Sequence, residues 1–311
     1  MNLRLGLIGL GNMGSAIALK FLKAYGRLTV YDISNEIKKK YNTKEYKDQG
    51  LSFANNLEEL CKNDVIWLMV PANAVDPVLS ELCKFIKKKL VIIDGGNSYF
   101  EDTKRRSGEL KKLCIDFLDC GTSGGLWGAQ NGFSLMVGGD KDVYEKVKDI
   151  FKHIAFNESA YLYVGPSGAG HYVKMVHNGI EYAVLESYAE GFSLLKQNSN
   201  YSDLDLSKIC NTWLEGSVIR SWVLQLICKI LQRDQTFEDV SGFVDLGGTG
   251  QWAVQEAEKD KIRLSLIKEA VQIRLNSHVS GGDYATKLVA LTRHEMGGHP
   301  VYGTCDICQK I

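Results

Sequence analysis

The sequence has no excess of either charge, since its 37 basic side chains are balanced by 37 acidic ones. A neutral chain has no general attraction for nucleic acid or for an anionic membrane surface, so any anion site must be local. The sequence also lacks a run approaching the roughly 20 apolar residues that span a bilayer, and it lacks a secretory signal pattern. We therefore expect a cytoplasmic protein that binds neither nucleic acid nor membrane.

The cysteine pattern of a structural zinc site is missing as well. Cys305 and Cys308 have the spacing of two metal ligands, but a tetrahedral site needs four and no second such pair exists. We assign this tail no function and expect no metal site. The remaining cysteines are scattered through apolar segments, which is typical of small, reduced core residues in a reducing compartment. They are Cys61, Cys83, Cys114, Cys120, Cys210 and Cys228.

The N-terminal segment has the pattern of a nucleotide-binding turn. An apolar strand pattern runs into three spaced glycines, and an amphipathic helix pattern follows. In such turns the first glycine permits the tight bend, the second leaves room for a pyrophosphate, and the third lets helix and strand pack closely. The amides at the helix N-terminus then face the phosphates. The predicted cofactor-binding residues are Gly9, Leu10, Gly11, Asn12, Met13 and Gly14.

An aspartate follows the second strand pattern, "RLTVYD", at the distance where an acidic residue binds the adenosine ribose hydroxyls. This residue, Asp32, would also repel a ribose phosphate, so the sequence favours NAD over NADP. Further strand patterns lead into the loops "VPAN", "GGNS" and "GTSGG". Because ligands bind beyond the carboxyl ends of parallel strands, we expect cofactor contacts from Val70, Pro71, Ala72 and Asn97.

Strand and helix patterns alternate through the first half of the 311 residues, and helical periodicity alone follows the segment "YVGPSGAG". The alternation predicts a parallel sheet covered by helices on both faces. We therefore expect an α/β protein with a Rossmann-type, doubly wound parallel sheet in a dinucleotide-binding domain of residues 1–166. An all-α domain of residues 167–311 is expected to follow it.

The second domain begins with a stripe of unlike polar groups. Lys174 is followed after three, four and seven residues by His177, Asn178 and Glu181, which share its helix face, with Tyr182 close by. A solvated helix face usually repeats Glu and Lys, whereas this stripe holds four different functional groups bordered by apolar residues. The pattern favours a functional site over a solvated surface.

These motifs resemble those of a known enzyme family. The segments "GLGNMG", "DGGNS", "SGG", "KMVHNGIEY" and "RHEMGGH" occur in this order, and with them the chain resembles the short form of the decarboxylating 6-phosphogluconate dehydrogenases. The resemblance implies oxidation of 6-phosphogluconate at its third carbon, loss of carbon dioxide and formation of ribulose 5-phosphate. The ketone formed lies β to the carboxylate and is itself an electron sink, so we expect no metal requirement.

The resemblance also implies roles for individual residues. Lys174 would be the catalytic base and Glu181 the acid. The tail residues would reach the active site of a neighbouring subunit, which makes the second domain a substrate and dimerisation domain and the protein at least a homodimer. The residues implied at the substrate are Asn97, Ser123, Gly124, Gly125, His177 and Asn178, with Tyr182 and Arg274 at its phosphate and Arg293 and His299 in the tail.

One departure and two alternatives stay open. Longer family members have a lysine at the position of Gln251, so one phosphate contact would be weakened or replaced. The chain could instead oxidise another β-hydroxyacid such as 3-hydroxyisobutyrate, although Tyr182, Arg274 and Arg293 would then be superfluous as phosphate-binding groups. A non-catalytic NAD-binding redox sensor would leave the lysine and the glutamate of the stripe unused. The sequence does not decide between pentose phosphate flux and gluconate breakdown.

Overall fold

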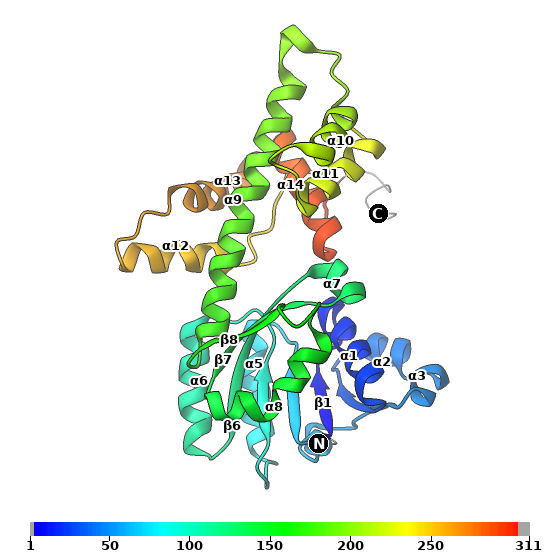
Figure 1. Cartoon of the computed structure of the whole chain (residues 1–311), viewed down its shortest axis with the longest axis vertical. Helices are drawn as coiled ribbons and strands as arrows, with labels where there is room; N and C mark the ends of the chain where they lie inside the picture. Colours follow the sequence, from blue (N-terminus) through cyan, green and yellow to red (C-terminus); the bar gives the residue numbers. More distant parts are fainter. Residues whose placement is uncertain (1–2, 304–311) are drawn as a thin grey trace. The chain divides into compact units, whose positions relative to one another are not determined.

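The structure, a computed structural model, describes residues 3–303 (Figure 1). Cys305 and Cys308 therefore lie outside the described residues. The chain divides into two compact units, Met1–Lys174 and Met175–Ile311. The domain boundary predicted after residue 166 stays a prediction.

Within residues 3–303, eight strands form one sheet in the order β3-β2-β1-β4-β5-β6-β7-β8. The strands β1 to β6 run parallel, and β1 pairs with β2 on one side and β4 on the other. The strand bounds are β1 Leu5–Ile8, β2 Leu28–Tyr31, β3 Leu51–Phe53, β4 Val65–Leu68, β5 Val91–Asp94, β6 Asp116–Ser123, β7 Ser134–Gly139 and β8 Tyr161–Gly165.

The sheet departs from parallel pairing at one edge. Strand β7 pairs antiparallel with β6, and β8 runs parallel to β7. The connection from β6 to β7 holds only the seven-residue helix α7 (Gly125–Asn131). A parallel crossover needs a dozen or more residues, so the short connection returns the chain in the opposite direction.

Helices cover both faces of the sheet, and alternate residues of each strand enter different cores. In β1 and β4, Leu7 and Trp67 join the core formed with α1 and α8, whereas Ile8 and Ile66 join the core formed with α4 and α5. Burial on both faces is what requires the nearly continuous apolar strands seen in the sequence. The other helices of this unit are α1 Asn12–Tyr25, α2 Asn35–Tyr41, α3 Lys44–Asp48, α4 Leu57–Leu60, α5 Ala72–Cys83, α6 Phe100–Lys112 and α8 Lys141–Ile154.

The rest of the described chain is helical, so the predicted α/β fold followed by an all-α region is confirmed. Its longest element is α9 (Ala169–Gln197), which contains the whole polar stripe. Leu185, Phe192 and residues of α10, α11 and α14 form one apolar core. The further helices are the short η1 Ser199–Tyr201, then α10 Leu206–Gly216, α11 Trp222–Arg233, α12 Thr249–Lys259, α13 Ser265–Ser280 and α14 Tyr284–Gly297.

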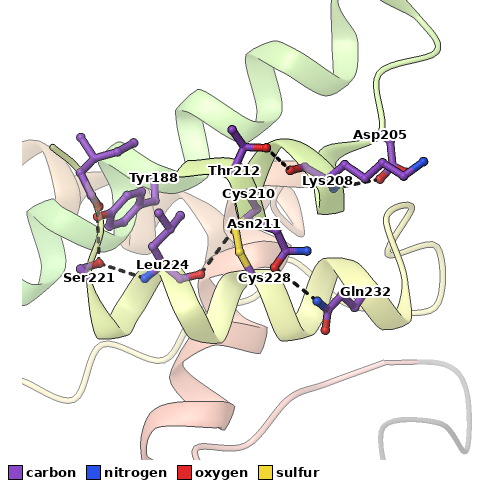
Figure 2. The surroundings of a disulfide bond; sticks show 11 residues. Tyr188, Asp205, Lys208, Cys210, Asn211, Thr212, Ser221, Leu224, Cys228 and Gln232 are labelled. Atoms are coloured by element: carbon purple, nitrogen blue, oxygen red, sulfur yellow. Dashed lines mark hydrogen bonds and ion pairs between the residues drawn. A yellow bond between two sulfur atoms is a disulfide. The ribbon is translucent and has the colours of Figure 1, made fainter. Parts of the chain in front are cut away.

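Two cysteines that were expected to be reduced are joined in a disulfide bond. Cys210 of α10 and Cys228 of α11 lie 5.5 Å apart at their Cα atoms (Figure 2). Both side chains are buried where the two helices pack, and that packing brings together positions 18 residues apart in the sequence. The prediction of reduced thiols is therefore wrong for this pair. Cys114 was also expected in the core, but it is exposed. Its backbone φ is 57°.

Among the helices of residues 3–303, none has both the length and the apolar character needed to cross a membrane. Within the same residues, no group of three or more His, Cys, Asp or Glu side chains is arranged to hold a metal ion.

Candidate functional site

The glycine turn between β1 and α1 has the geometry expected for close approach of a phosphate. Gly9 has a φ of 93°, and a Cβ there would lie 2.3 Å from the Met69 carbonyl oxygen. A Cβ at Gly14 would lie 2.0 Å from the Gly9 carbonyl oxygen, whereas a Cβ at Gly11 would meet no atom within 4 Å. The first and third glycines are thus required by packing. The second leaves an open face of backbone beside the N-terminus of α1, which suits a pyrophosphate.

Asp32, directly after β2, is buried and holds the same turn in place. Its Oδ2 accepts a hydrogen bond from the Leu10 amide at 2.7 Å, and its Oδ1 accepts one from the Ser34 amide at 2.7 Å. Each carboxylate oxygen can accept further hydrogen bonds, so these contacts leave capacity for ribose hydroxyls. The residue therefore has a structural role that the sequence prediction did not include.

The loops after β4 and β5 lie next to each other. A Cβ at Gly96 would lie 2.9 Å from the Val70 carbonyl oxygen, and Pro71 is the residue preceding α5, which begins at Ala72. In the second loop Ser98 is buried and donates to Asp94 Oδ2 at 2.7 Å, while Asn97 is exposed. An anchored backbone thus presents an exposed amide side chain at the carboxyl end of the sheet, where ligands bind in such folds.

Ser123 ends β6, and the next two glycines turn the chain into α7. Gly124 and Gly125 have φ values of 141° and 52°, which side chains with a Cβ adopt rarely. A Cβ at Gly124 would lie 3.1 Å from the Phe133 ring. The predicted "SGG" residues therefore form a loop whose conformation depends on both glycines.

The first turn of α9 is fixed by two residues that the sequence prediction missed. Asp119 is fully buried and accepts hydrogen bonds from the amides of Gly168 and His171 at 2.8 Å and 3.0 Å. The buried His171 shares a hydrogen bond of 2.8 Å with Thr103 Oγ1 and another of 3.2 Å with the Asp94 carbonyl oxygen. His171 precedes Lys174 by about one helical turn, and this spacing is the signal that could have identified it.

Lys174 packs directly on the sheet. It is half-buried, and a Cβ at Gly121 of β6 would lie only 2.5 Å from the Lys174 Cβ. The absence of a side chain at Gly121 therefore lets the helix approach the strand closely at the position of the lysine.

The remaining stripe residues belong to the second unit. Asn178 Oδ1 lies 3.1 Å from His177 Nδ1, and Asn178 Nδ2 donates to Thr249 Oγ1 at 3.3 Å. Tyr182 is buried, and its hydroxyl donates to the Leu246 carbonyl oxygen. Glu181 is half-buried on the same helix, and its charge acts on Arg293 of α14. The structure thus ties two of the predicted substrate residues, Asn178 and Tyr182, to the segment that precedes and begins α12.

Arg274 of α13 is fully buried against this tyrosine. Its guanidinium carbon lies 3.3 Å from the centroid of the Tyr182 ring, and its Nε donates to Glu186 Oε1 at 3.5 Å. Gln251 lies in the first turn of α12, and the preceding Gly250 packs on the same ring, since a Cβ there would lie 2.5 Å from Tyr182 Cε2. Tyr182, Arg274 and the start of α12 therefore form one cluster.

The two tail residues join this cluster within the same chain. Burial lowers the pKa of Arg293, and the neighbouring charge of Arg274 lowers it further. Burial lowers the pKa of His299 to about 4, again helped by Arg293 and Arg274. Arg274, Arg293 and His299 therefore lie in one region, in which the charge of Asp245 also acts on Arg293 and His299, and the histidine is neutral near pH 7.

Comparison with known proteins gives two family matches that together span most of the chain. Residues 4–165 match the family described as the NAD binding domain of 6-phosphogluconate dehydrogenase. Residues 170–295 match the family described as the 6-phosphogluconate dehydrogenase C-terminal domain.

Individual relatives agree with these matches. A Haloferax volcanii protein named NAD(+)-dependent, decarboxylating 6-phosphogluconate dehydrogenase is 39% identical over 306 residues, which cover 96% of this chain and 98% of the relative. A Bacillus subtilis enzyme of the same name is 37% identical but longer, so that 87% of this chain covers 60% of it. Among solved structures, Plasmodium falciparum 6-phosphogluconate dehydrogenase, described in complexes with NADP+ and with 6-phosphogluconate, has a TM-score of 0.78 at 28% identity, covering 93% of this chain and 70% of that one.

Proposed function

The chain belongs to the 6-phosphogluconate dehydrogenase family, and we propose that it converts 6-phosphogluconate to ribulose 5-phosphate and carbon dioxide while reducing NAD. The observation that carries this proposal is the run from Lys174 to Tyr182 on α9, in which a base, an acid and hydrogen-bonding groups share one helix. The cluster of Tyr182 and Arg274 supports a phosphorylated substrate, because a planar guanidinium suits phosphate oxygens.

In this proposal the bound nicotinamide supplies the hydride acceptor, and the chain supplies the proton transfers. The neutral amine of Lys174 accepts the proton of the hydroxyl on the third carbon while that carbon is oxidised. The resulting ammonium then donates a hydrogen bond to the new ketone oxygen and stabilises the negative charge that develops there as carbon dioxide leaves. Glu181, in its protonated form, then donates a proton to the first carbon of the resulting enediolate, whose oxygen the Lys174 ammonium stabilises, and this yields ribulose 5-phosphate.

We propose Asp32 as the reason for a preference for NAD. Its carboxylate is fixed by two backbone amides beside the glycine turn, so it cannot move away from a ribose phosphate without losing both hydrogen bonds. Repulsion of the phosphate by this fixed charge would weaken binding of NADP. The cytoplasmic location and the absence of a metal requirement stay predictions from the sequence.

We propose a homodimer, supported by an apolar row on α9. Val176, Ile180 and Val184 recur every four residues and are 37%, 55% and 37% exposed. A contiguous apolar row of this kind is typical of a helix that packs against a partner.

The further prediction that Arg293 and His299 act in the neighbouring active site competes with the arrangement seen in one chain, where both lie near Arg274. Mixing Lys174→Ala and Arg293→Ala proteins distinguishes the two. If Arg293 acts in the active site of the neighbouring subunit, mixing restores activity, because each mixed dimer then contains one intact site. If Arg293 acts in the active site of its own chain, every site lacks either Lys174 or Arg293, and the mixture is inactive.

The proposed activity is tested by mixing the purified protein with 6-phosphogluconate, gluconate or 3-hydroxyisobutyrate, each with NAD or NADP in metal-free buffer. We expect reduced cofactor to form with 6-phosphogluconate alone and with a higher kcat/KM for NAD. Activity on an unphosphorylated acid alone would contradict the proposed substrate. A higher kcat/KM for NADP would contradict the role given to Asp32.

A further inference from the structure

Glu186 takes no part in the mechanism above, yet it is buried beside the cluster proposed for the phosphate. It lies on α9 one turn after Tyr182 and is 4% exposed. Its Oε1 accepts a hydrogen bond from Arg274 Nε at 3.5 Å. Among the residues that the structure describes, neither Glu186 Oε2 nor Arg274 Nη1 and Nη2 has a hydrogen-bond partner, although all three atoms are buried.

This ion pair is incomplete. A guanidinium offers five N–H donors, and burying it without partners for both terminal nitrogens costs free energy that one long hydrogen bond to a carboxylate does not offset. The Tyr182 ring, 3.3 Å from the guanidinium carbon, restricts the plane of the group, and Glu186 holds its Nε edge. The two terminal nitrogens of Arg274 therefore lack acceptors, and an oxyanion with several acceptor atoms would supply them.

We propose that Glu186 is a positioning residue that holds Arg274 for the substrate phosphate and takes up a proton when that phosphate binds. The inference rests on the proposed function for the identity of the phosphate. It does not require Glu186 to take part in catalysis, because the mechanism assigns this residue no proton transfer.

Glu186 takes up a proton because the carboxylate and the phosphate compete for the same cation, Arg274. Burial raises the pKa of Glu186 to about 7, Arg274 opposes this rise, and the negative charges of Glu190 and Asp283 add to it. A phosphate dianion that pairs with Arg274 removes much of the attraction that keeps Glu186 charged and adds a negative charge nearby. The pKa of Glu186 is therefore higher in the complex than in the free protein.

The direction of the pH dependence follows by linkage. Anion affinity is highest below the pKa of the free protein, falls as the pH rises between the free and bound pKa values, and is constant above both. A bound pKa one unit above the free value corresponds to about a tenfold loss of affinity across this interval. The other charged groups that face the cluster are His299, Arg293, Asp245 and Glu181. Burial lowers the pKa of His299 to about 4, so this histidine does not produce a slope near pH 7, and Arg293 stays charged.

Inorganic sulfate is a suitable probe, since it remains a dianion throughout this range whereas a phosphate monoester does not. Calorimetric titration of sulfate, with NAD present to fill the cofactor's own phosphate site, gives its affinity from about pH 6 to about pH 8.5. We expect about a tenfold decrease for the unaltered protein and a constant affinity for Glu186→Gln. The matched control is Glu190→Gln, which removes an exposed carboxylate one turn further along α9. Since the charge of Glu190 helps to raise the pKa of Glu186, this variant keeps the decrease in affinity but moves it to lower pH.

Folding of Glu186→Gln is checked by circular dichroism and thermal melting. If this variant does not fold, sulfate binding to the unaltered protein in two buffers of different ionisation enthalpy still measures the proton taken up. A pH-independent sulfate affinity, an unchanged slope in folded Glu186→Gln, or binding without proton uptake would each overturn the inference. Sulfate binding with the expected slope in a protein that does not oxidise 6-phosphogluconate would refute the proposed substrate while supporting the role of Glu186.

Discussion

Replacing Gly121 by alanine tests whether the lysine of the stripe is held against the sheet. The new Cβ would lie 2.5 Å from Lys174 Cβ, 2.7 Å from the Gly170 carbonyl oxygen and 3.1 Å from Met136 Cε. Ordinary contacts begin near 3.4 Å, so the start of α9 and β6 must separate by about 1 Å. Because one of the close atoms belongs to the backbone, a change of rotamer cannot relieve the clash.

Overpacking of this kind lowers the free energy of unfolding by about 1–3 kcal/mol, which corresponds to several degrees of melting temperature. A shift of about 1 Å in a proton-transferring group lowers turnover by about 100-fold. We therefore expect Gly121→Ala to fold, to melt at a lower temperature and to oxidise 6-phosphogluconate about 100-fold more slowly. Calorimetry measures the melting temperature, and the rate of reduced cofactor formation measures the turnover.

Gly108→Ala is the matched control, because this glycine lies in α6 and a Cβ there meets no atom within 4 Å. Alanine in a helix interior stabilises by about 0.5–1 kcal/mol relative to glycine, so this variant should be slightly more stable and fully active. If Gly121→Ala matched the unaltered protein in both melting temperature and turnover, the packing of the lysine on β6 would be refuted.

Three further predictions concern other parts of the chain. Reducing the bond between Cys210 and Cys228, 18 residues apart, should lower the free energy of unfolding by about 3 kcal/mol in denaturant titrations, whereas a protein with serine at both positions should not respond to reductant (Figure 2). Asp32→Asn should raise the KM for NAD and reduce the ratio of kcat/KM for NAD to that for NADP by about tenfold, and a constant ratio would exclude its role in cofactor choice. Lys174→Ala and Glu181→Gln should each lower turnover by at least about 100-fold with an unchanged Kd for NAD measured by fluorescence.

The features that the sequence predicted are those determined by neighbouring residues. Gly9, Gly11 and Gly14 are close in sequence, and each has a local backbone reason to be glycine, so the turn between β1 and α1 was predictable. The stripe on α9 was predictable for the same reason, since helical periodicity alone places Lys174 and Glu181 two turns apart.

The features that were missed depend on tertiary packing. Glu186 lies one turn beyond Tyr182, but its importance comes from Arg274, which is 88 residues away in the sequence. The disulfide likewise depends on how α10 and α11 pack, and no spacing rule relates Cys210 to Cys228. Asp119 resembles an ordinary strand residue, and its hydrogen bonds to the start of α9 become visible only in three dimensions.

The central claim is that Lys174 and Glu181 carry out an oxidative decarboxylation of a phosphorylated sugar acid. The most direct measurement uses 6-phosphogluconate labelled at its carboxyl carbon and follows labelled carbon dioxide and reduced NAD together. The account predicts one carbon dioxide for each reduced NAD with the unaltered protein and the loss of both products with Lys174→Ala. Reduction of NAD without release of label, or release at an unchanged rate from folded Lys174→Ala, would contradict it.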